Sequence, residues 1–200
     1  MVIERLIGGL MRAAATRHMR LEPGAHVQIP APPDRPLLLY IHVPFCEVLC
    51  PFCSFHRIRF DRERAERHFD ALRREIALYH ERGFRFDSVY VGGDTPTVLP
   101  AQLTDTLSYI RSLYPIGRVS VETNPDHLTP DVLDRLADAG VDRLSVGVQS
   151  FDDDLLRAMQ RYETYGSGKQ IMSGLARAHG RVNTLKQDRV RIPEVLDERP

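Results

Sequence analysis

The sequence predicts an α/β fold in which a parallel sheet is covered by helices. Short apolar segments and longer amphipathic segments alternate four times from residue 37 to the region beyond residue 152. Glycine, proline or a Thr-Pro pair separates most of these segments, as expected at the ends of strands and helices. Right-handed crossovers turn such a repeat into a parallel sheet. The repeat alone fits either a closed barrel or an open, doubly wound sheet.

The N-terminal region is predicted to differ from this repeat. Residues 1–20 carry four arginines against a single acidic residue, Glu4, and their apolar residues recur at helical spacing. An amphipathic helix packed on the domain is the preferred interpretation, and an organelle presequence is the alternative. Residues 22–35 contain four prolines and read as an extended linker. Residues 1–36 are therefore assigned to an N-terminal helix and a proline-rich linker.

The first strand and the first helix of the repeat have clear boundaries. Pro36 precedes the continuous apolar run LLLYIHV at residues 37–43, which is typical of a strand buried on both faces. Between residues 62 and 82, apolar side chains recur at helical spacing among alternating charges, and Gly83 follows. A glycine after the last periodic residue predicts that the helix ends there.

The later elements follow the same pattern. Thr129 and Pro130 predict a helix start, with the threonine as N-cap and the proline at the first helical position. Gly92 and Gly93 are expected to end the second strand. In chain order, the remaining predicted elements are a strand at 87–91, a helix at 101–113, a strand at 118–122, a helix from 130 to Gly140, a strand at 142–148 and a helix from Asp152.

The C-terminal stretch departs from this pattern. Residues 184–191 read TLKQDRVR, which is heavily charged and predicts no further strand. About four β/α units are therefore expected in a core domain at residues 37–183, followed by a divergent charged tail at 184–200. The sheet would then have an exposed edge after its fourth strand, which is a liability for solubility.

Composition and charge exclude several classes of function. Lys plus Arg and Asp plus Glu both number 27, so no charge excess indicates binding to nucleic acid or to an acidic membrane surface. No apolar run of the sequence is long enough to span a bilayer. The three cysteines are an odd number with no secretory signal before them, which argues against a disulfide framework. Free thiols suit a reducing compartment, and we predict a cytoplasmic protein.

The cysteines lie close together as Cys46, Cys50 and Cys53, in the spacing C-x3-C-x2-C. Three thiolates on one short loop can hold three irons of a [4Fe–4S] cluster and leave the fourth iron open to a small molecule, whereas structural clusters normally have four protein thiolates. A zinc site would need a fourth ligand, which His56 or His42 could supply. The spacing alone favours the iron–sulfur cluster and leaves zinc open.

Unusual residues follow each of the four predicted strands. The cysteine loop follows the first strand, Gly92 and Gly93 the second, Glu122 the third and Gln149 the fourth. Ligands bind at the carboxyl ends of the strands both in barrels and in open parallel sheets. The sequence therefore predicts an active site at this edge of the sheet.

Four motifs, in the same order along the chain, resemble those of radical S-adenosylmethionine enzymes. Within these enzymes the resemblance is to the oxygen-independent coproporphyrinogen III oxidase group, which includes the related heme chaperones, and it extends from about residue 37 to residue 161. The motifs are YIHVPFC-x3-C-x2-C at 40–53, GGDTPT at 92–97, VETNPD at 121–126 and DRLSVGVQSF at 142–151. The resemblance implies a partial (β/α)6 TIM-like barrel of the radical SAM type.

The resemblance also implies cofactors and their ligands. Cys46, Cys50 and Cys53 would bind a [4Fe–4S] cluster, and its open iron would chelate the amino and carboxylate groups of S-adenosyl-L-methionine. The reduced cluster then donates an electron and breaks a carbon–sulfur bond of that cofactor, which gives a 5′-deoxyadenosyl radical. The other residues that the resemblance places at the cofactor are Tyr40, Gly92, Gly93, Asp94, Thr95, Glu122, Gln149 and Arg161.

The function that the resemblance implies is radical chemistry on a tetrapyrrole. In the oxidase reaction the radical abstracts hydrogen from a propionate of the porphyrinogen, which loses carbon dioxide and becomes a vinyl group in porphyrin and heme biosynthesis. An electron donor such as flavodoxin or ferredoxin is then expected. The alternative is a heme chaperone, which binds heme without this oxidation. No residue is assigned a catalytic role.

Three features depart from the family pattern. Asp94 stands where the family has the third glycine of a Gly-Gly-Gly-Thr-Pro loop, so its charge could repel the cofactor carboxylate, and a positive φ there would strain it. Fewer β/α units are expected than in the family's barrel. Phe55 stands where some relatives carry an extra cysteine, which favours the chaperone-like or divergent relatives over the oxidase itself. A degenerate, non-catalytic fragment of the family is therefore a third hypothesis.

Overall fold

The computed structural model describes residues 29–179, 181 and 184–189. The chain divides into two compact units, at residues 1–31 and 32–200, and of the first unit only residues 29–31 are described, without regular secondary structure. The predicted N-terminal helix and the last residues of the predicted tail therefore lie outside the described residues. All the helices and strands that the structure describes belong to the second unit.

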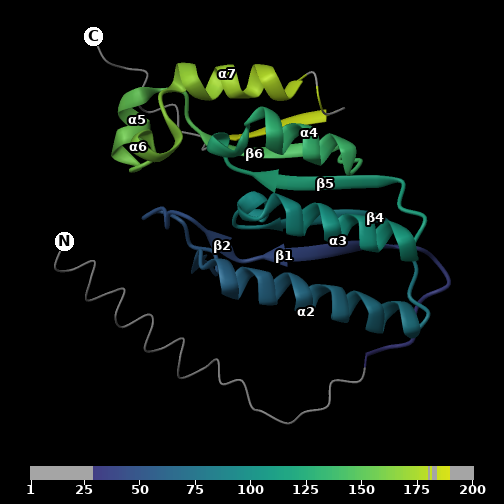
Figure 1. Cartoon of the computed structure of the whole chain (residues 1–200). Helices are drawn as coiled ribbons and strands as arrows, with labels where there is room; N and C mark the ends of the chain where they lie inside the picture. Colours follow the sequence, from purple (N-terminus) through teal and green to yellow (C-terminus); the bar gives the residue numbers. More distant parts are fainter. Residues whose placement is uncertain (1–28, 180, 182–183, 190–200) are drawn as a thin grey trace, which may run out of the picture. The chain divides into compact units, whose positions relative to one another are not determined.

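The second unit is built on a five-stranded parallel sheet (Figure 1). Its strand order, β1-β4-β5-β6-β7, is also the order of these strands along the chain. The strands are β1 (Leu37–Val43), β4 (Phe86–Gly93), β5 (Arg118–Thr123), β6 (Arg143–Gln149) and β7 (Thr184–Arg189). A separate short pair consists of β2 (Phe45–Cys46) and β3 (Ile58–Arg59).

Helices connect successive strands of the main sheet. They are α2 (Arg62–Glu81), α3 (Pro100–Leu113), α4 (Pro130–Asp138), α5 (Asp153–Ala158), α6 (Tyr162–Tyr165) and α7 (Gly168–His179), with short 3-10 turns η1 (Pro96–Val98) and η2 (Pro125–His127). Helices α2, α3 and α4 lie on the same side of the sheet (Figure 1). A doubly wound sheet would reverse its strand order and carry helices on both faces, whereas a barrel keeps chain order with helices outside. The fold is therefore a partial (β/α) barrel, as predicted.

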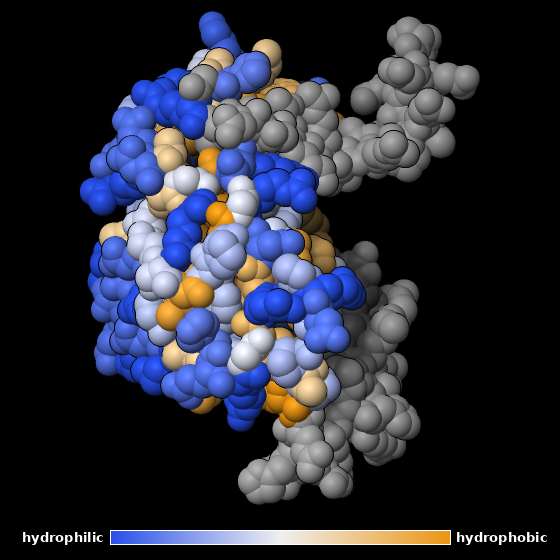
Figure 2. Space-filling model, turned by 90° about the vertical axis from the view of Figure 1, so that its right-hand side faces the viewer, coloured by the Kyte–Doolittle hydropathy of each residue, from blue (hydrophilic) through white to orange (hydrophobic). Residues whose placement is uncertain are grey.

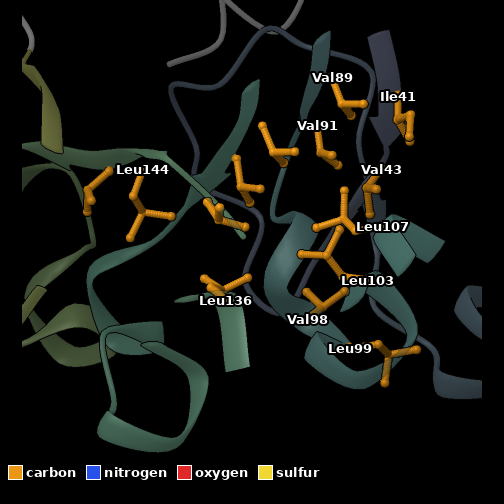
Figure 3. Packing of buried hydrophobic residues seen from close by; sticks show 14 of the residues in the cluster. Ile41, Val43, Val89, Val91, Val98, Leu99, Leu103, Leu107, Leu136 and Leu144 are labelled. Atoms are coloured by element: carbon orange, nitrogen blue, oxygen red, sulfur yellow. The ribbon is translucent and has the colours of Figure 1, made fainter. Parts of the chain in front are cut away.

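The core lies between the sheet and this helical layer. Alternate side chains of β1 and β4 meet the buried face of α3 (Figure 3), and the labelled ones are at most 3% exposed, namely Ile41, Val43, Val89, Val91, Leu103 and Leu107. The prediction that residues 37–43 are buried on both faces is wrong, because Leu38 and Tyr40 are 57% and 53% exposed. The helices cover only one face of β1, and the other face would be the inside of a barrel.

The surface at the end where the strands begin is mostly hydrophilic, with small separate hydrophobic patches (Figure 2). No helix within the described part of the chain is long and apolar enough to cross a membrane.

Several helix ends follow the signals in the sequence. Thr129 caps α4 by accepting a hydrogen bond from the backbone N–H of Val132 (3.4 Å), and Pro130 occupies the first helical position, as predicted. Gly83 and Gly140 follow α2 and α4 with φ of 81° and 71°. Both glycines take the left-handed conformation that ends a helix.

The segment after β6 forms three helices rather than the one predicted from Asp152. Asp152 caps α5 by accepting hydrogen bonds from the N–H groups of Asp154 and Leu155, both at 2.9 Å. The chain then takes left-handed conformations at Gln160 (φ 55°) and Gly166 (φ 85°). Because a right-handed helix cannot contain such residues, the segment breaks at these two points.

The prediction that residues 184–191 form no strand is wrong. β7 pairs in parallel with β6, with Thr184 opposite Arg143 and Arg189 opposite Gln149. Strand pairing is made by backbone groups, so a charged sequence can still add to the open edge of β6. The sheet therefore continues beyond its fourth strand.

Leu107→Ala tests the packing of α3 on the sheet. Leu107 is 1% exposed, and truncation of a buried leucine leaves a cavity, so the free energy of unfolding should fall by about 2–5 kcal/mol. Leu78→Ala is the matched control. Leu78 on α2 is 49% exposed, so its truncation should lower the free energy of unfolding far less. Urea denaturation measures both variants, and equal losses would contradict this packing.

Candidate functional site

The cysteine loop leaves the carboxyl end of β1 and is closed at its base. The N–H of Ile58 donates to the carbonyl of Pro44 at 2.7 Å, next to the pairing of β2 with β3. Within the loop, the N–H of Cys53 donates to the carbonyl of Cys50 at 3.2 Å, so these two cysteines flank a tight turn. The loop between residues 44 and 58 thereby holds all the cysteines of the chain.

Each cysteine has its own environment. Cys50 is 8% exposed, and its sulfur accepts a hydrogen bond from Arg161 Nη1 at 3.2 Å. Cys46 Sγ lies 3.4 Å from Thr95 Oγ1. Burial raises the pKa of the Cys46 thiol to about 11, although the hydrogen bond with Thr95 opposes the shift. Cys53 is half-buried against the hydrophobic core. A metal that binds here would have to displace the proton of Cys46.

β4 continues through the two glycines that were expected to end it, and both lie where a side chain would not fit. A Cβ on Gly93 would lie 2.7 Å from the carbonyl oxygen of Val43, and its φ of 114° is unfavourable for any other residue. A Cβ on Gly92 would lie 2.9 Å from the ring of Tyr90 and 3.2 Å from the carboxyl carbon of Glu122. The glycines therefore let β4 approach both β1 and this carboxylate closely.

Asp94 follows the glycines without backbone strain. The positive φ belongs to Gly93 and not to Asp94, so the expected conformational penalty for aspartate does not arise. The Asp94 N–H donates to the carbonyl of Val43 at 3.0 Å, and its buried Oδ2 has no hydrogen-bond partner in the structure. Burial raises the pKa of the Asp94 carboxyl, against the opposing effect of His42 and Arg57. This oxygen is free to accept a hydrogen bond from a ligand.

Thr95 joins the glycine loop to the cysteines. Its backbone N–H donates to the carbonyl of Phe45 at 3.0 Å, and its hydroxyl accepts from Asn124 Nδ2 at 2.8 Å beside Cys46. Asn124 also donates to the hydroxyl of Tyr165 at 3.4 Å. Sequence reasoning did not single out Asn124, although it lies within the VETNPD motif at 121–126.

Glu122 is a carboxylate held in place by two hydrogen bonds. The hydroxyl of Tyr90 donates to its Oε1 at 2.5 Å, and the N–H of Gly93 donates to its Oε2 at 3.2 Å. Burial and the hydrogen bond to Glu122 raise the pKa of Tyr90 to about 12. The ring of Tyr40 stacks on Tyr90 with centroids 6.0 Å apart, and the Tyr40 hydroxyl lies 3.0 Å from His42 Nδ1.

Arg161 is buried, although a charged helix would ordinarily expose it. It is 3% exposed, its Nη2 donates to the carbonyl of Gly147 at 2.6 Å, and its guanidinium lies 3.9 Å from the ring centroid of Tyr165. Together with the hydrogen bond to Cys50, these contacts leave only Nε without a partner. A fixed positive charge therefore lies against one of the sulfurs, which suits a thiolate ligand. Gln149, with φ of 66°, ends β6.

A single cavity of about 500 Å³ brings most of the predicted site residues together. It is lined by all three cysteines and by Gly93, Asp94, Glu122, Gln149 and Arg161. Tyr40 and Gly92 lie next to Glu122, and Thr95 lies next to Cys46, without lining the cavity themselves. Tyr165 also lies on the cavity wall.

The family model of the radical SAM superfamily matches residues 40–193, which is more than half of the chain and includes the whole cavity. The chain belongs to the radical SAM superfamily. The match begins at β1 and extends past β7, so all five strands of the sheet fall largely within it.

Relatives of this radical SAM chain carry functions connected with tetrapyrroles. An oxygen-independent coproporphyrinogen III oxidase of Salmonella typhimurium is 36% identical over 138 residues, which are 64% of this chain and 30% of the relative. Heme chaperone HemW of Bacillus subtilis is 38% identical over 129 residues, 61% of this chain and 34% of the relative. The chain thus spans about a third of the length of these curated relatives.

A solved structure shows the same fold. Coproporphyrinogen III oxidase (HemN) from Escherichia coli, described as a radical SAM enzyme, superimposes with a TM-score of 0.70 at 31% identity. The superposition covers 80% of this chain and 38% of the enzyme. The described sheet and helices are therefore similar to part of that enzyme's fold.

The three thiols of this radical SAM chain are spread too widely for one zinc ion. Two sulfurs bound to the same zinc, each at about 2.3 Å, can be no more than about 4.6 Å apart. Among the described residues, the ligating side chains whose donor atoms gather within 4.8 Å of one another are Glu47, Asp126 and His127, and the sulfurs form no such group with each other or with His42 or His56. The described positions of the three thiols therefore do not match a site for a single zinc ion.

The burial of Cys46 predicts slow alkylation of its thiol in the apoprotein. Because the pKa rises from 9.0 to about 11, the thiolate fraction near neutral pH should be about 100-fold smaller than in the unfolded chain, and iodoacetamide should react correspondingly slowly. The folded state keeps a proton that the unfolded chain loses, so the stabilising contribution is present below pH 9.0 and is lost as the pH rises towards about 11.

Peptide mass spectrometry of Cys46 after timed alkylation measures this rate. The urea-unfolded chain at the same pH is the control, because it exposes the same thiol. Equal rates in the folded and unfolded protein would contradict the burial of Cys46.

Proposed function

We propose that Cys46, Cys50 and Cys53 hold a [4Fe–4S] cluster and that S-adenosyl-L-methionine binds beside it in the cavity. The observation that carries this proposal is that one cavity of about 500 Å³ collects the three thiols with polar side chains from the ends of β4, β5 and β6. Membership of the radical SAM superfamily supports the same assignment. When bound, the cluster supplies the electron that cleaves the carbon–sulfur bond of the cofactor.

The chain's own residues bind and orient the cofactor in this proposal. The backbone of Gly93 provides a surface that no side chain obstructs. Glu122, held by Tyr90 and by the N–H of Gly93, presents a fixed carboxylate. Gln149, on the cavity wall, would contact the ribose of the cofactor. Nε of Arg161, which has no hydrogen-bond partner, would donate to the cofactor carboxylate. Groups fixed before binding need little reorganisation when the ligand arrives.

Asp94 is assigned to the amino end of the cofactor. Its buried Oδ2 has no hydrogen-bond partner, and an amino group that binds the open iron keeps N–H groups that can donate to it. The absence of backbone strain at Asp94 also removes one reason to regard the site as degenerate. The alternative is that its charge repels the cofactor carboxylate.

The substrate class that we propose is a tetrapyrrole, and the reaction is the oxidative decarboxylation of porphyrinogen propionates. The relatives with coproporphyrinogen oxidase function support this choice. Such a reaction would need an electron donor such as flavodoxin or ferredoxin, and we place the protein in the cytoplasm. The other parts of a complete barrel would have to contribute the remaining substrate contacts.

A heme chaperone is the second candidate. Phe55 lines the cavity and is 75% exposed, at a position where some relatives have an extra cysteine. An exposed aromatic ring offers an apolar surface to a flat heme rather than another metal ligand. The similarity to the heme chaperone of Bacillus subtilis supports this alternative. Heme binding without turnover of coproporphyrinogen would favour it.

Anaerobic reconstitution with iron and sulfide tests the cofactor site. Electron paramagnetic resonance of the reduced protein should show a [4Fe–4S] signal that changes when S-adenosyl-L-methionine is added, because the cofactor binds the open iron. Cys50→Ser should lose most of the signal, since a cysteine ligand is removed. Ser54→Ala in the same loop is the matched control and should keep it. A signal that the cofactor leaves unchanged would favour the non-catalytic hypothesis.

Asp94→Asn tests the assignment of the carboxylate. Loss of a charge-assisted hydrogen bond should weaken S-adenosyl-L-methionine binding to the reconstituted protein about 10- to 100-fold in equilibrium dialysis. Asp87→Asn is the control, because Asp87 lies on the same strand at its opposite end. Tighter binding by Asp94→Asn would show that the carboxylate repels the cofactor instead.

A further inference from the structure

Four side chains form a continuous series of hydrogen bonds from the sheet to the cysteine loop. The hydroxyl of Thr123, the last residue of β5, lies 2.7 Å from the hydroxyl of Thr97 in η1. The Thr97 hydroxyl lies 2.6 Å from Nδ1 of His127 in η2. Nε2 of His127 lies 3.0 Å from Oε2 of Glu47, which directly follows Cys46.

Donors and acceptors can be matched along the whole series of hydrogen bonds. Thr97 can accept a hydrogen bond from Thr123 and donate its own proton to Nδ1 of a neutral His127. Nε2 of that imidazole then carries the proton and donates it to the carboxylate of Glu47. A hydrogen bond at one ring nitrogen sets the role of the other. Because a carboxylate can only accept, Nε2 of His127 is the donor to Glu47 whichever way the threonine hydroxyls point.

The series is buried at one end and exposed at the other. Thr97 and Thr123 are 2% and 4% exposed, whereas the side chains of His127 and Glu47 are 14% and 50% exposed. Exposed ion pairs usually contribute little, partly because two mobile side chains must be ordered to form them. Here the buried hydroxyl of Thr97 already holds His127, so the hydrogen bond between His127 and Glu47 orders only one further side chain.

A second hydrogen bond holds the loop at Cys50. Arg57 Nη1 donates to the backbone carbonyl of Cys50. The backbone beside Cys46 is therefore held through Glu47, and the backbone at Cys50 through Arg57. Between these ties the loop exposes Val48 and Leu49, 36% and 42% respectively. Val48 and Leu49 therefore add little burial to this segment, whereas the side chains of Cys46 and Cys50 at its ends also contact Thr95 and Arg161.

We infer that His127 is a positioning residue that, through Glu47, holds the cysteine loop in its ligating shape before the cluster binds. A loop that is already ordered loses less conformational freedom when it takes up its ligand. The inference rests on the proposed function in one respect, that the ligand of the loop is an iron–sulfur cluster. The state of the loop itself can be measured without any metal.

Hydrogen–deuterium exchange of the apoprotein tests whether the loop is held. Glu47→Ala removes the acceptor, and the amides of residues 46–53 should exchange about fivefold faster than in the wild type. Glu47→Gln keeps an oxygen that accepts from His127 and should exchange like the wild type. Glu163→Ala, at an exposed glutamate of α6, is the control for loss of a surface charge. Unchanged exchange in Glu47→Ala, or an equal increase in Glu47→Gln, overturns the inference.

Thr97 variants test the series one step further from the loop. Thr97→Val removes the hydroxyl that orients His127, so the same amides should exchange faster, and Thr97→Ser should restore the wild-type rate. A general loss of stability would speed exchange throughout the sheet, whereas loss of positioning confines the increase to residues 46–53. An increase that Thr97→Ser does not reverse overturns the role of the threonine hydroxyl.

The rate at which an iron chelator removes the reconstituted cluster tests the consequence for the ligand. Glu47→Ala should lose the cluster about fivefold faster than the wild type, and Glu47→Gln should match the wild type. Faster loop exchange with unchanged cluster loss overturns the positioning role. A wild-type protein that takes up no cluster would contradict the proposed function, while the exchange rates would still decide whether His127 holds the loop.

Discussion

The close approach of Gly93 to the end of β1 determines where the other site residues lie. A Cβ at this position would come within 2.7 Å of the Val43 carbonyl oxygen, so only glycine allows the two strands to meet as they do. The N–H of Asp94 then donates to that same carbonyl, and Thr95 continues alongside the start of the cysteine loop. Thr95 thereby reaches Cys46, and Asp94 reaches the cavity. A larger residue at position 93 would separate the glycine loop from the cysteines.

The charged groups of the cavity are fixed by the fold before any ligand is present. Glu122 is held by a tyrosine hydroxyl and a backbone N–H, and Arg161 by a sulfur, a carbonyl and an aromatic ring. Burying charged groups costs free energy unless they are paired and hydrogen-bonded. Oδ2 of Asp94 and Nε of Arg161, two unpaired atoms of residues that line this cavity, are atoms that a ligand with both an amino group and a carboxylate would satisfy.

The sequence was informative where local residue chemistry controls the backbone. Thr129 and Gly140 bound α4 correctly, because a cap and a left-handed glycine act within one turn. The convergence of the cysteines, Glu122 and Gln149 followed from the rule that parallel strands end at one edge.

Features that depend on distant contacts were not predictable. β7 forms from a charged segment because the edge of β6 offers backbone partners, and one face of β1 stays exposed because the helices cover only the other. The hydrogen bond between Glu47 and His127 joins residues 80 positions apart, and no local sequence pattern predicts it. The left-handed Gln160 likewise breaks a segment that reads as one helix.

Mössbauer spectroscopy of protein reconstituted with iron-57 tests most directly whether three thiolates hold a cluster with one open iron. With S-adenosyl-L-methionine, one of the four irons should become distinct from the other three, because only that iron lacks a cysteine ligand. A spectrum in which all the irons stay equivalent and ignore the cofactor, or one with no cluster iron, would contradict the account.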